Sequence, residues 1–318
     1  MSSSEKKTPV FDRRPVPSHL RASSDPSAHS PSFEKLKRIQ KVKTFIQKAL
    51  SYFLLTLGSI TMVGPFLWMF STSLKDPGAV FSFQKNWWEE WIPNSFVWQN
   101  YIKAWHVVPF ARFYLNSIFV TSAVTFGQVA TSAMAAYAFA RLRFPGREKI
   151  FFSYLATMMV PGAVTMIPVF ILLRHLGWID TYKALIFPGI FTAYGTFMLR
   201  QFFLTLPKEL EDAAQIDGCS YFGIFWKIIL PLSKPALATL TTFTFMGSWM
   251  NFMWPLIVIN TEERFTLPVG LAYFQSLHHT DWTLLMAASV MMILPILLVF
   301  MFNQRFFVEG IKLTGIKG

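Results

Sequence analysis

Long apolar runs separated by short polar stretches dominate the chain after residue 49. Each run holds about 20 residues or more, which is the length that a helix needs to cross the hydrocarbon core of a bilayer. The pattern therefore predicts an all-α membrane protein with six transmembrane helices, because a helix satisfies its own backbone hydrogen bonds in lipid. The six predicted spans cover residues 50–71, 112–139, 150–173, 184–204, 235–260 and 283–303.

Segments of different composition flank the predicted spans. Residues 1–33 are rich in Ser, Pro and basic side chains, which predicts a disordered basic N-terminal tail. Residues 34–49 carry a run of Lys and Arg that predicts a cytoplasmic or interfacial lead-in helix, which either binds anionic lipid headgroups or marks the cytoplasmic side. Residues 50–303 are then the six-helix transmembrane domain, and residues 304–318 are a cytoplasmic C-terminal tail.

Basic residues gather in alternate connections between the spans. Cytoplasmic loops carry the excess of Lys and Arg, so this asymmetry places both termini in the cytoplasm and accounts for the formal net charge of +12. The basic residues are not interleaved with aromatic ones in a compact patch, which argues against nucleic acid as a partner. On the predicted cytoplasmic side lie Arg141, Arg143, Arg147, Lys149, Lys208, Lys227, Lys234, Arg305, Lys312 and Lys317.

The predicted outer loops are rich in aromatic side chains. Those of the first loop either anchor the chain at the membrane interface or form a surface for an extracytoplasmic partner. Adjacent His278 and His279 converge on one metal less readily than a helical i, i+4 pair, so no metal site is predicted. The single cysteine, Cys219, excludes an internal disulfide. The tryptophans of the first loop are Trp87, Trp88, Trp91, Trp98 and Trp105.

The spans hold helix breakers and neutral polar residues. The breakers predict kinks, which suit helices around a gated path. No carboxylate or histidine lies near the middle of a span, although an ion-coupled carrier usually needs such a group. The neutral polar residues either bind sugar hydroxyls and sugar faces or tie helices together. The breakers are Pro161, Gly162, Pro168, Pro188, Gly189, Gly195, Pro255 and Pro295, and the candidates for the substrate path are Tyr194, Trp249 and Asn251.

A polar segment from Pro207 to Pro231 interrupts the apolar runs and predicts a helical hairpin. Pro207 suits a first helical position, and the acidic residues after it favour the positive end of the helix dipole. Gly218 suits the left-handed end of that helix, Ser220 suits the cap of a second helix, and Pro231 discourages its continuation. The first helix is either laid into a groove of a partner or an ordinary amphipathic connector.

The hairpin resembles the EAA loop of ABC importer permeases, whose pattern is Glu-Ala-Ala, three residues, Gly, nine residues, Ile, one residue and Leu-Pro. Asp212 stands where the family usually has Glu, with Glu211 directly before it. The strings AYAFARLRFPGR and GSWMNFMWPLIVI are similar to pieces of the carbohydrate branch, and of the smaller permease subunit of the maltodextrin importer in particular. The matching positions of the EAA pattern are Asp212, Ala213, Ala214, Gly218, Ile228, Leu230 and Pro231.

The resemblance implies a transport subunit of the bacterial plasma (inner) membrane. Its implied partners are a second permease subunit in a heterodimer, two ATPase subunits, an extracytoplasmic solute-binding protein and membrane lipid. The sequence has no GxxxxGK[ST] loop, so ATP and Mg are expected on the ATPase, with no cofactor or catalytic residue in this chain. Residues 261–281 and 306–318 are candidate contacts with the binding protein and the ATPase. The implied ATPase-coupling residues are Glu211, Asp212, Ala213, Ala214, Asp217, Gly218, Ile228, Leu230 and Pro231.

Within that machine the resemblance assigns docking to Ala213, Ala214 and Gly218, and orientation of the hairpin to Asp212. The implied function is ATP-driven import of a sugar, an oligosaccharide in the first place, by alternating access. Two alternatives stay open: the same machine for a sugar phosphate or amino acid, and an ion-coupled carrier that works alone. The spans carry no Arg or Lys near their middle, which favours a neutral sugar over a phosphate. A purely structural anchor leaves the hairpin unexplained.

Overall fold

The computed structural model describes residues 31–80, 88, 91–275 and 280–315. In these residues every regular element is a helix, apart from one isolated β-bridge between Gln275 and Thr280. The predicted tail at 1–30, and His278 and His279, lie outside them. The chain divides into two units, Met1–Gly64 and Pro65–Gly318.

The helices follow one another closely along the chain. The α-helices are α1 (Pro31–Ser73), α2 (Gln99–Val107), α3 (Phe110–Arg141), α4 (Arg147–Ala156), α5 (Gly162–His175), α6 (Tyr182–Ile186), α7 (Ala193–Thr205), α8 (Glu209–Ile216), α9 (Tyr221–Ile224), α10 (Leu230–Leu232), α11 (Lys234–Trp249), α12 (Met253–Val258), α13 (Leu267–Leu271) and α14 (Trp282–Gly315). The 3-10 turns are η2 (Pro77–Ala79), η4 (Thr157–Met159), η5 (Phe187–Gly189), η7 (Glu262–Arg264) and η8 (Ala272–Phe274), and η6 (Phe225–Ile229) is a π-helical turn.

The first unit contains most of α1, which joins the predicted lead-in helix and first span in one continuous helix. From Arg38 to Val63 every residue is exposed within this chain. A helix with exposed Leu, Ile and Phe on all sides suits a lipid or protein surrounding rather than water. Its stretch Arg38–Ser73 is long and apolar enough to cross a membrane. The predicted boundary between residues 49 and 50 is therefore not a break in the structure.

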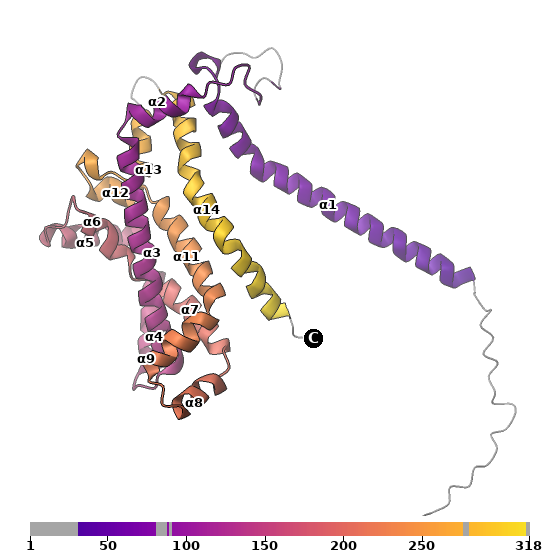
Figure 1. Ribbon diagram of the computed structural model, residues 1–318, viewed down its shortest axis with the longest axis vertical. Coiled ribbons are helices and arrows are strands. Elements are labelled where there is room, and N and C mark those ends of the chain that lie inside the picture. Colours follow the sequence, from indigo (N-terminus) through magenta and orange to yellow (C-terminus); the bar gives the residue numbers. More distant parts are fainter. Residues whose placement is uncertain (1–30, 81–87, 89–90, 276–279, 316–318) are drawn as a thin grey trace, which may run out of the picture. The chain divides into compact units, whose positions relative to one another are not determined.

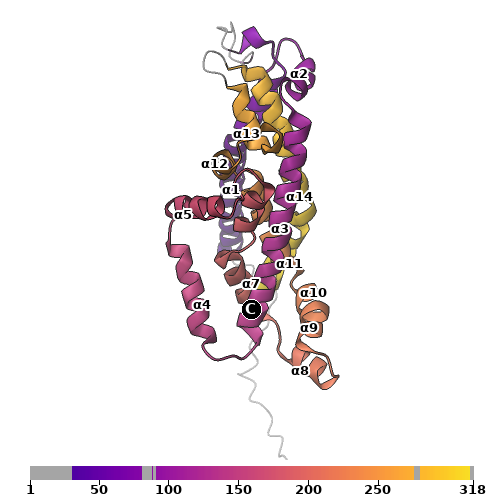
Figure 2. The ribbon, with the colours of Figure 1, turned by 90° about the vertical axis from the view of Figure 1, so that its left-hand side faces the viewer.

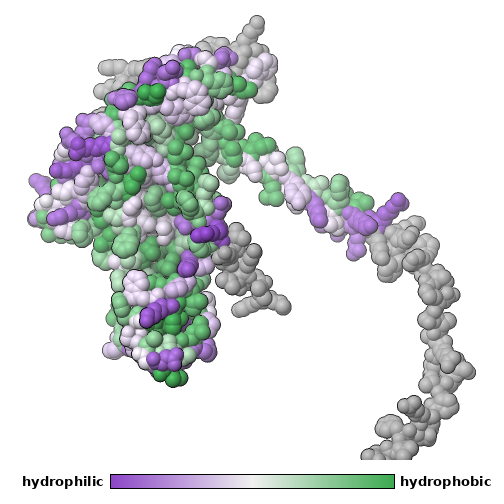
Figure 3. Space-filling view, viewed as in Figure 1, coloured by the Kyte–Doolittle hydropathy of each residue, from purple (hydrophilic) through white to green (hydrophobic). Residues whose placement is uncertain are grey.

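The second unit is built around α3. Figures 1 and 2 show α3, α11 and α14 running along the bundle, with α3 packed against α7 and α11, and α11 packed against α14. One cluster of buried apolar side chains lies toward α2 and α13, and it includes Phe110, Phe113, Trp249 and Leu267. A second cluster lies toward the hairpin and joins α3, α7, α9 and α11. Apolar side chains cover much of the visible face of the bundle, as a membrane requires (Figure 3).

The predicted spans differ in how far they form single helices. Among the residues that the structure describes, three helical stretches meet the length and hydropathy of a membrane span, Arg38–Ser73, Phe110–Arg141 and Trp282–Phe306, and up to five do so if two bent pairs are included. Residues 150–173 are not one straight helix, because Arg147–Met159 and Gly162–His175 meet at 99°. Residues 184–204 are divided between α6 and α7. The count of six spans is therefore not shown by the helices themselves.

Only some of the predicted helix breakers lie at breaks between helices. Pro161 precedes the first residue of α5, and Pro188 lies in η5, so both stand at breaks. Pro168 and Pro295 lie inside α5 and α14, which continue past them. The predicted C-terminal tail is a continuation of α14 up to Gly315.

Gly270 allows α13 to approach α3 closely. A Cβ atom at this position would lie 2.2 Å from Cδ2 of Phe113, a ring that is fully buried and has no room to move. Gly270→Ala is therefore expected to destabilise the protein by about 1–3 kcal/mol, the usual cost of overpacking. The measurement is the thermal unfolding midpoint in detergent. Gly58→Ala is the matched control, since its Cβ would meet nothing within 4 Å. Equal midpoints for the two variants would contradict the prediction.

Candidate functional site

The hairpin begins where α7 ends. Helix α7 stops at Thr205, and α8 starts at Glu209, two residues after the predicted start at Pro207. Glu209, Glu211 and Asp212 lie in the first turn of α8, where negative charge interacts favourably with the helix dipole. The predicted first helix of the hairpin is therefore present, with its acidic end as expected.

Gly218 and Ser220 form the turn of the hairpin as predicted. Gly218 has a φ of 81°, in the left-handed region that favours glycine. Its N–H donates to the carbonyl of Gln215 at 3.0 Å, and the N–H of Cys219 donates to the carbonyl of Ala214 at 2.9 Å, which is the Schellman arrangement. The hydroxyl of Ser220 then accepts a hydrogen bond from the N–H of Gly223 at 3.2 Å and caps α9.

The second helix of the hairpin ends at Leu232, one residue after the predicted end at Pro231. The helical path continues from α9 through the π-turn η6 into α10, and it bends by 79° before α11. Pro231 has no N–H to donate, and the wider π-turn before it accommodates that loss without a break. The bend lies at Ser233, between Leu232 and Lys234. Ile228 and Leu230 are half-buried in this segment.

A buried arginine at the end of α3 holds the hairpin. Nη2 of Arg141 donates to the carbonyl oxygens of Phe203 and Leu206, each at 2.7 Å. Nε of the same residue lies 2.7 Å from Oε1 of Glu211, and only 9% and 6% of the two side chains are exposed. One turn earlier on α3, the hydroxyl of Tyr137 donates to the carbonyl of Tyr221 at 3.1 Å. The end of α3 therefore contacts α7, α8 and α9.

Glu211, and not Asp212, is the carboxylate that contacts the bundle. Glu211 is 5% exposed, whereas Asp212 is exposed to solvent. Burial raises the pKa of the Glu211 carboxyl above its ordinary value and the charge of Asp212 adds to this, while Arg141 and Lys208 act in the opposite direction. Glu211 pairs with Arg141 and holds α8 against the bundle, whereas Asp212 faces solvent, and its predicted orientation role stays a prediction.

The two alanines of the EAA-like pattern face opposite ways. Ala214 is 8% exposed and belongs to the buried cluster beside the hairpin. Ala213 is exposed, as are Asp217 and Gly218. Ile216 is 86% exposed on the same short helix, an unusual position for a large apolar side chain in contact with water. The surface of α8 that is open to a partner therefore includes Ala213 and Ile216 but not Ala214.

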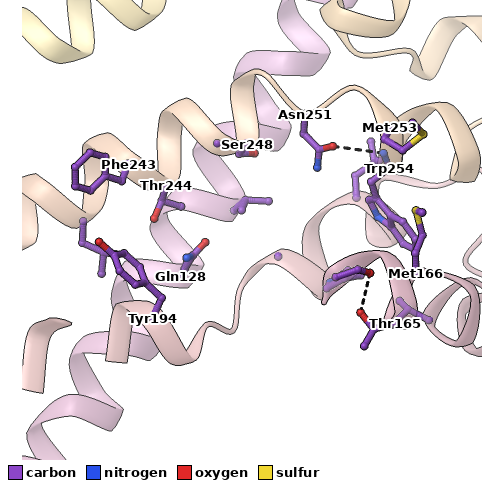
Figure 4. A pocket seen from close by; sticks show the side chains of 18 residues that line it. Gln128, Thr165, Met166, Tyr194, Phe243, Thr244, Ser248, Asn251, Met253 and Trp254 are labelled. Atoms are coloured by element: carbon purple, nitrogen blue, oxygen red, sulfur yellow. Dashed lines mark hydrogen bonds between the residues drawn. The ribbon is translucent and has the colours of Figure 1, made fainter. Parts of the chain in front are cut away.

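A cavity of about 750 Å³ lies among α3, α5, α7 and α11. Figure 4 shows Gln128, Tyr194, Thr244 and Ser248 along one part of it, and Thr165, Asn251 and Trp254 along another. The backbone N–H of Trp254 donates to Oδ1 of Asn251 at 3.4 Å. The described lining combines hydroxyl, amide and aromatic groups without a charged side chain. The full set is Val124, Gln128, Gly162, Thr165, Met166, Val169, Leu185, Pro188, Gly189, Tyr194, Leu240, Phe243, Thr244, Gly247, Ser248, Asn251, Met253 and Trp254.

Two of the three residues predicted for the substrate path line this cavity. Tyr194 and Asn251 do so. Trp249 does not: it is 1% exposed, its ring stacks on Phe245 at 5.7 Å, and its Nε1 donates to the carbonyl of Met292 at 2.9 Å. Trp249 therefore packs α11 against α14. Sequence reasoning missed Trp254, although an indole beside Asn251 in one short motif is a usable signal for a sugar-stacking surface.

The loop between α12 and α13 is held by polar side chains. The Nδ2 group of Asn116 donates to the carbonyls of Glu263 and Phe265, both at 2.9 Å. The carboxylate of Asp180 accepts from the N–H groups of Asn260 and Thr261 at 3.0 and 2.9 Å. Arg264 lies 2.8 Å from the same carboxylate. Part of the predicted binding-protein contact at 261–281 is therefore fixed to α3 and to the connection between α5 and α6.

The Asp180 carboxylate gives this loop a predictable dependence on pH. Burial opposes its charge, but the hydrogen bonds from Thr261 and Asn260 and the charge of Arg264 hold its pKa below the ordinary 3.8. A lowered pKa in the folded state stabilises the loop above about pH 5, and this stabilisation is lost as the pH falls through the folded-state pKa. The protection of residues 258–264 against hydrogen exchange, relative to the intrinsic exchange rate at each pH, should therefore persist at mildly acidic pH and fall only as the pH drops through the lowered pKa of Asp180.

Asp180→Asn tests the same contact. Asp180 has a φ of 60°, which asparagine tolerates, so the variant removes the charge without straining the backbone. At neutral pH the loop should be less protected from exchange than in wild type, and its protection relative to the intrinsic exchange rate should no longer change near the pKa of Asp180. Wild-type exchange rates in this variant would show that the charge of Asp180 does not hold the loop.

Long apolar helices broken by proline, an uncharged cavity between them with a few polar groups in its wall, and a projecting helical hairpin are the features of a multi-pass membrane permease. Residues 127–313 match the family "Binding-protein-dependent transport system inner membrane component". The chain belongs to this family, whose members are the permease subunits of ABC importers, and the prediction of an ABC importer permease is confirmed. It is therefore an inner-membrane component of such a transport system.

Individual proteins are similar over most of the chain. The arabinooligosaccharides transport system permease protein AraQ of Halalkalibacterium halodurans is 41% identical over 203 residues, which are 64% of this chain and 73% of that protein. The sn-glycerol-3-phosphate transport system permease protein UgpE of Yersinia pestis is 36% identical over 228 residues, 69% of this chain and 81% of the other. A chain of the crystal structure of a bacterial ABC transporter involved in the import of the acidic polysaccharide alginate has a TM-score of 0.74, 25% identity, and coverage of 83% of this chain and 98% of that chain.

Proposed function

We propose that this chain is a permease subunit of an ATP-driven importer that carries a neutral sugar, an oligosaccharide in the first place, across the plasma membrane. The observation that carries the proposal is the lining of the cavity, which is uncharged and largely apolar with several hydroxyl and amide groups among the apolar ones. Its volume of about 750 Å³ lies within the usual range of small-molecule sites. Amide and hydroxyl groups suit the hydroxyls of a sugar, and the Trp254 indole suits an apolar sugar face.

The relatives are named for different solutes. We therefore infer the substrate class from the side chains that line the cavity and not from the relatives. AraQ is named for arabinooligosaccharides, UgpE for glycerol 3-phosphate, and the structural relative for acidic alginate. An anionic solute favours Arg or Lys along its path. The described lining contributed by this chain has neither, which favours a neutral sugar. A sugar phosphate is the second candidate, and it requires cationic side chains from another subunit.

Six spans with both termini in the cytoplasm give the proposed arrangement. The bent pair around Pro161 forms the third span, and α6 with α7 forms the fourth. The hairpin then faces the cytoplasm, where Ala213, Gly218 and the exposed side of α8 dock on one of two ATPase subunits. ATP-driven closure of the ATPases moves the hairpin and changes the side on which the cavity opens, while a binding protein delivers the sugar from outside.

Cys219, the single cysteine of the chain, tests this orientation. It lies in the turn of the hairpin and is half-buried. A membrane-impermeant maleimide is expected to label Cys219 in inside-out vesicles and in detergent, but not in right-side-out vesicles. A Cys219→Ser chain is the control for background labelling. Labelling from the outer face would reverse the proposed topology.

The test of the function is purification from the native membrane followed by reconstitution. Affinity purification of this chain should recover a second permease and a soluble protein with a phosphate-binding loop, identified by mass spectrometry. The recovered complex in liposomes should then take up a neutral sugar only with ATP and the loaded binding protein. Transport by this chain alone without ATP would contradict the proposal and favour an ion-coupled carrier. Transport of a sugar phosphate in preference to the neutral sugar would support the second candidate.

A further inference from the structure

The end of α3 contacts the hairpin and α7 through one side chain. The Arg141 guanidinium donates from Nη2 to the carbonyls of Phe203 and Leu206, each at 2.7 Å, and its Nε forms an ion pair with Oε1 of Glu211 at 2.7 Å. The Phe203 carbonyl lies in the last turn of α7, where it also accepts from the N–H of Leu206 at 3.1 Å, and Leu206 is the residue that follows this helix. The carboxylate belongs to the first turn of α8. One rigid, planar group therefore connects the ends of α3, α7 and α8.

The short helix α8 needs such a connection. Its eight residues pack mainly against α9, and Ala214 is its other buried residue beside Glu211. Most of its remaining side chains are exposed, Ile216 among them. Without Glu211, α8 would still pack through Ala214 in the buried cluster beside the hairpin, but it would lose its charged contact with α3. The ion pair is also nearly free of solvent, so water and salt weaken it little.

The cavity lies along the same two helices. Helix α3 contributes Val124 and Gln128 to its lining, and α7 contributes Tyr194. Arg141 is the last residue of α3, and its side chain binds the C-terminal end of α7. The two helices also pack against each other. A displacement of α8 that is carried by Arg141 therefore reaches both walls of the cavity at once. A displacement that passes only through the backbone reaches α7 first, through the connection from Thr205 to Glu209.

We propose that Arg141 is a positioning residue that transmits movement of the hairpin to α3 and α7, through its contacts with Glu211, Phe203 and Leu206. This inference rests on the proposed import function, because it assigns a role in the coupling of ATP hydrolysis to transport. It differs from the docking role of the exposed side of α8, since Arg141 and Glu211 are buried within this chain. Removal of the contact should uncouple the ATPase from the cavity and leave the docking surface as it is.

The experiment compares variants of the complete reconstituted complex, with permease, ATPases and binding protein. Glu211→Ala removes only the contact with α8, because Arg141 keeps its two carbonyl acceptors. Arg141→Lys keeps the charge but loses the planar fork that binds the two carbonyls and the carboxylate together. Arg143→Ala is the matched control, a nearby arginine that is exposed and has no hydrogen bond or ion pair within the described chain. Two quantities are measured: ATPase recovered per permease chain, and sugar transported per ATP hydrolysed.

The expected result separates transmission from simple stability. Glu211→Ala should retain its ATPase subunits but transport about tenfold less sugar per ATP, within the usual size of a coupling between sites. Arg141→Lys should lie between this variant and wild type, and Arg143→Ala should match wild type. A purely structural role would lower the yield of complex without changing the ratio, since unfolded complexes neither hydrolyse ATP nor transport.

Three outcomes would overturn the proposal. The first is a wild-type ratio of sugar to ATP in Glu211→Ala. The second is a loss of ATPase from Glu211→Ala in proportion to the loss of transport, which would make the contact a part of docking. The third is an Arg143→Ala ratio that falls as far as that of Glu211→Ala. Failure of the import function itself is seen separately, as a wild-type complex without ATP-dependent uptake, and it refutes the proposal as well.

Discussion

Gly218→Pro is expected to abolish the association of this chain with its ATPase subunits while leaving its insertion into the membrane intact. Proline fixes φ near about −65°, whereas Gly218 has a φ of 81°. The variant also loses the N–H that donates to the Gln215 carbonyl at 3.0 Å. The turn between α8 and α9 can then no longer form, and the exposed side of α8 is no longer presented. Co-purification of the ATPase with the tagged chain measures the effect.

Gly218→Asn is the matched control for this prediction. Asparagine tolerates the left-handed conformation and keeps the N–H, and a Cβ at this position meets nothing within 4 Å. It should retain the ATPase. Ala213→Trp tests the docking surface directly, because this exposed position has no role in the turn. A proline variant that recovers as much ATPase as wild type would refute the docking role of the hairpin.

Gly247→Trp is expected to reduce transport at least about tenfold, equal to about 1.4 kcal/mol in the barrier. Gly247 lies on α11 in the wall of the cavity, and a Cβ there has no neighbour within 4 Å. The indole can therefore extend into the open space without displacing buried side chains. Sugar uptake by the reconstituted complex is the measurement, with co-purification of the ATPase as evidence that the complex is assembled.

Gly247→Ala shares the site and the helix but fills almost none of the cavity. It should transport like wild type, and its helix should be slightly stabilised, since alanine is favoured over glycine in a helix interior. If Gly247→Trp transports normally with its ATPase bound, the cavity is not part of the sugar path. Equal loss in both variants would indicate a requirement for flexibility of α11 rather than for open space.

Short-range features of the hairpin could be predicted from sequence. The roles of Gly218 and Ser220 depend on hydrogen bonds to residues three to five positions away, so a local pattern was sufficient. The contact of Glu211 with Arg141 joins residues far apart in the chain, and sequence gave no sign of it. Neighbouring residues on a helix point about 100° apart, so the pattern alone did not show that Glu211 faces the bundle while Asp212 faces solvent.

Prediction of the spans from sequence was limited in a similar way. Their apolar composition predicted long helices correctly at α1, α3 and α14. It did not show which side of a span faces a cavity, so Trp249 and Asn251 received the same prediction although only Asn251 lines the cavity. The effect of proline was equally dependent on surroundings, because Pro161 stands at a break and Pro168 lies within α5. Neighbouring helices decide whether the freed backbone groups are satisfied.

The π-turn η6 takes up one extra residue in the second helix of the hairpin. A π-turn contains one residue more than the corresponding α-helical turn and accommodates it by a local widening. Deletion of one residue between Phe225 and Ile229 would restore regular α-helical spacing before Pro231. The helical segments on either side would keep nearly the same rotation about their axes, because the widened turn holds the extra residue within itself. A chain shortened by one residue at this turn should therefore still present the exposed side of α8 as wild type does.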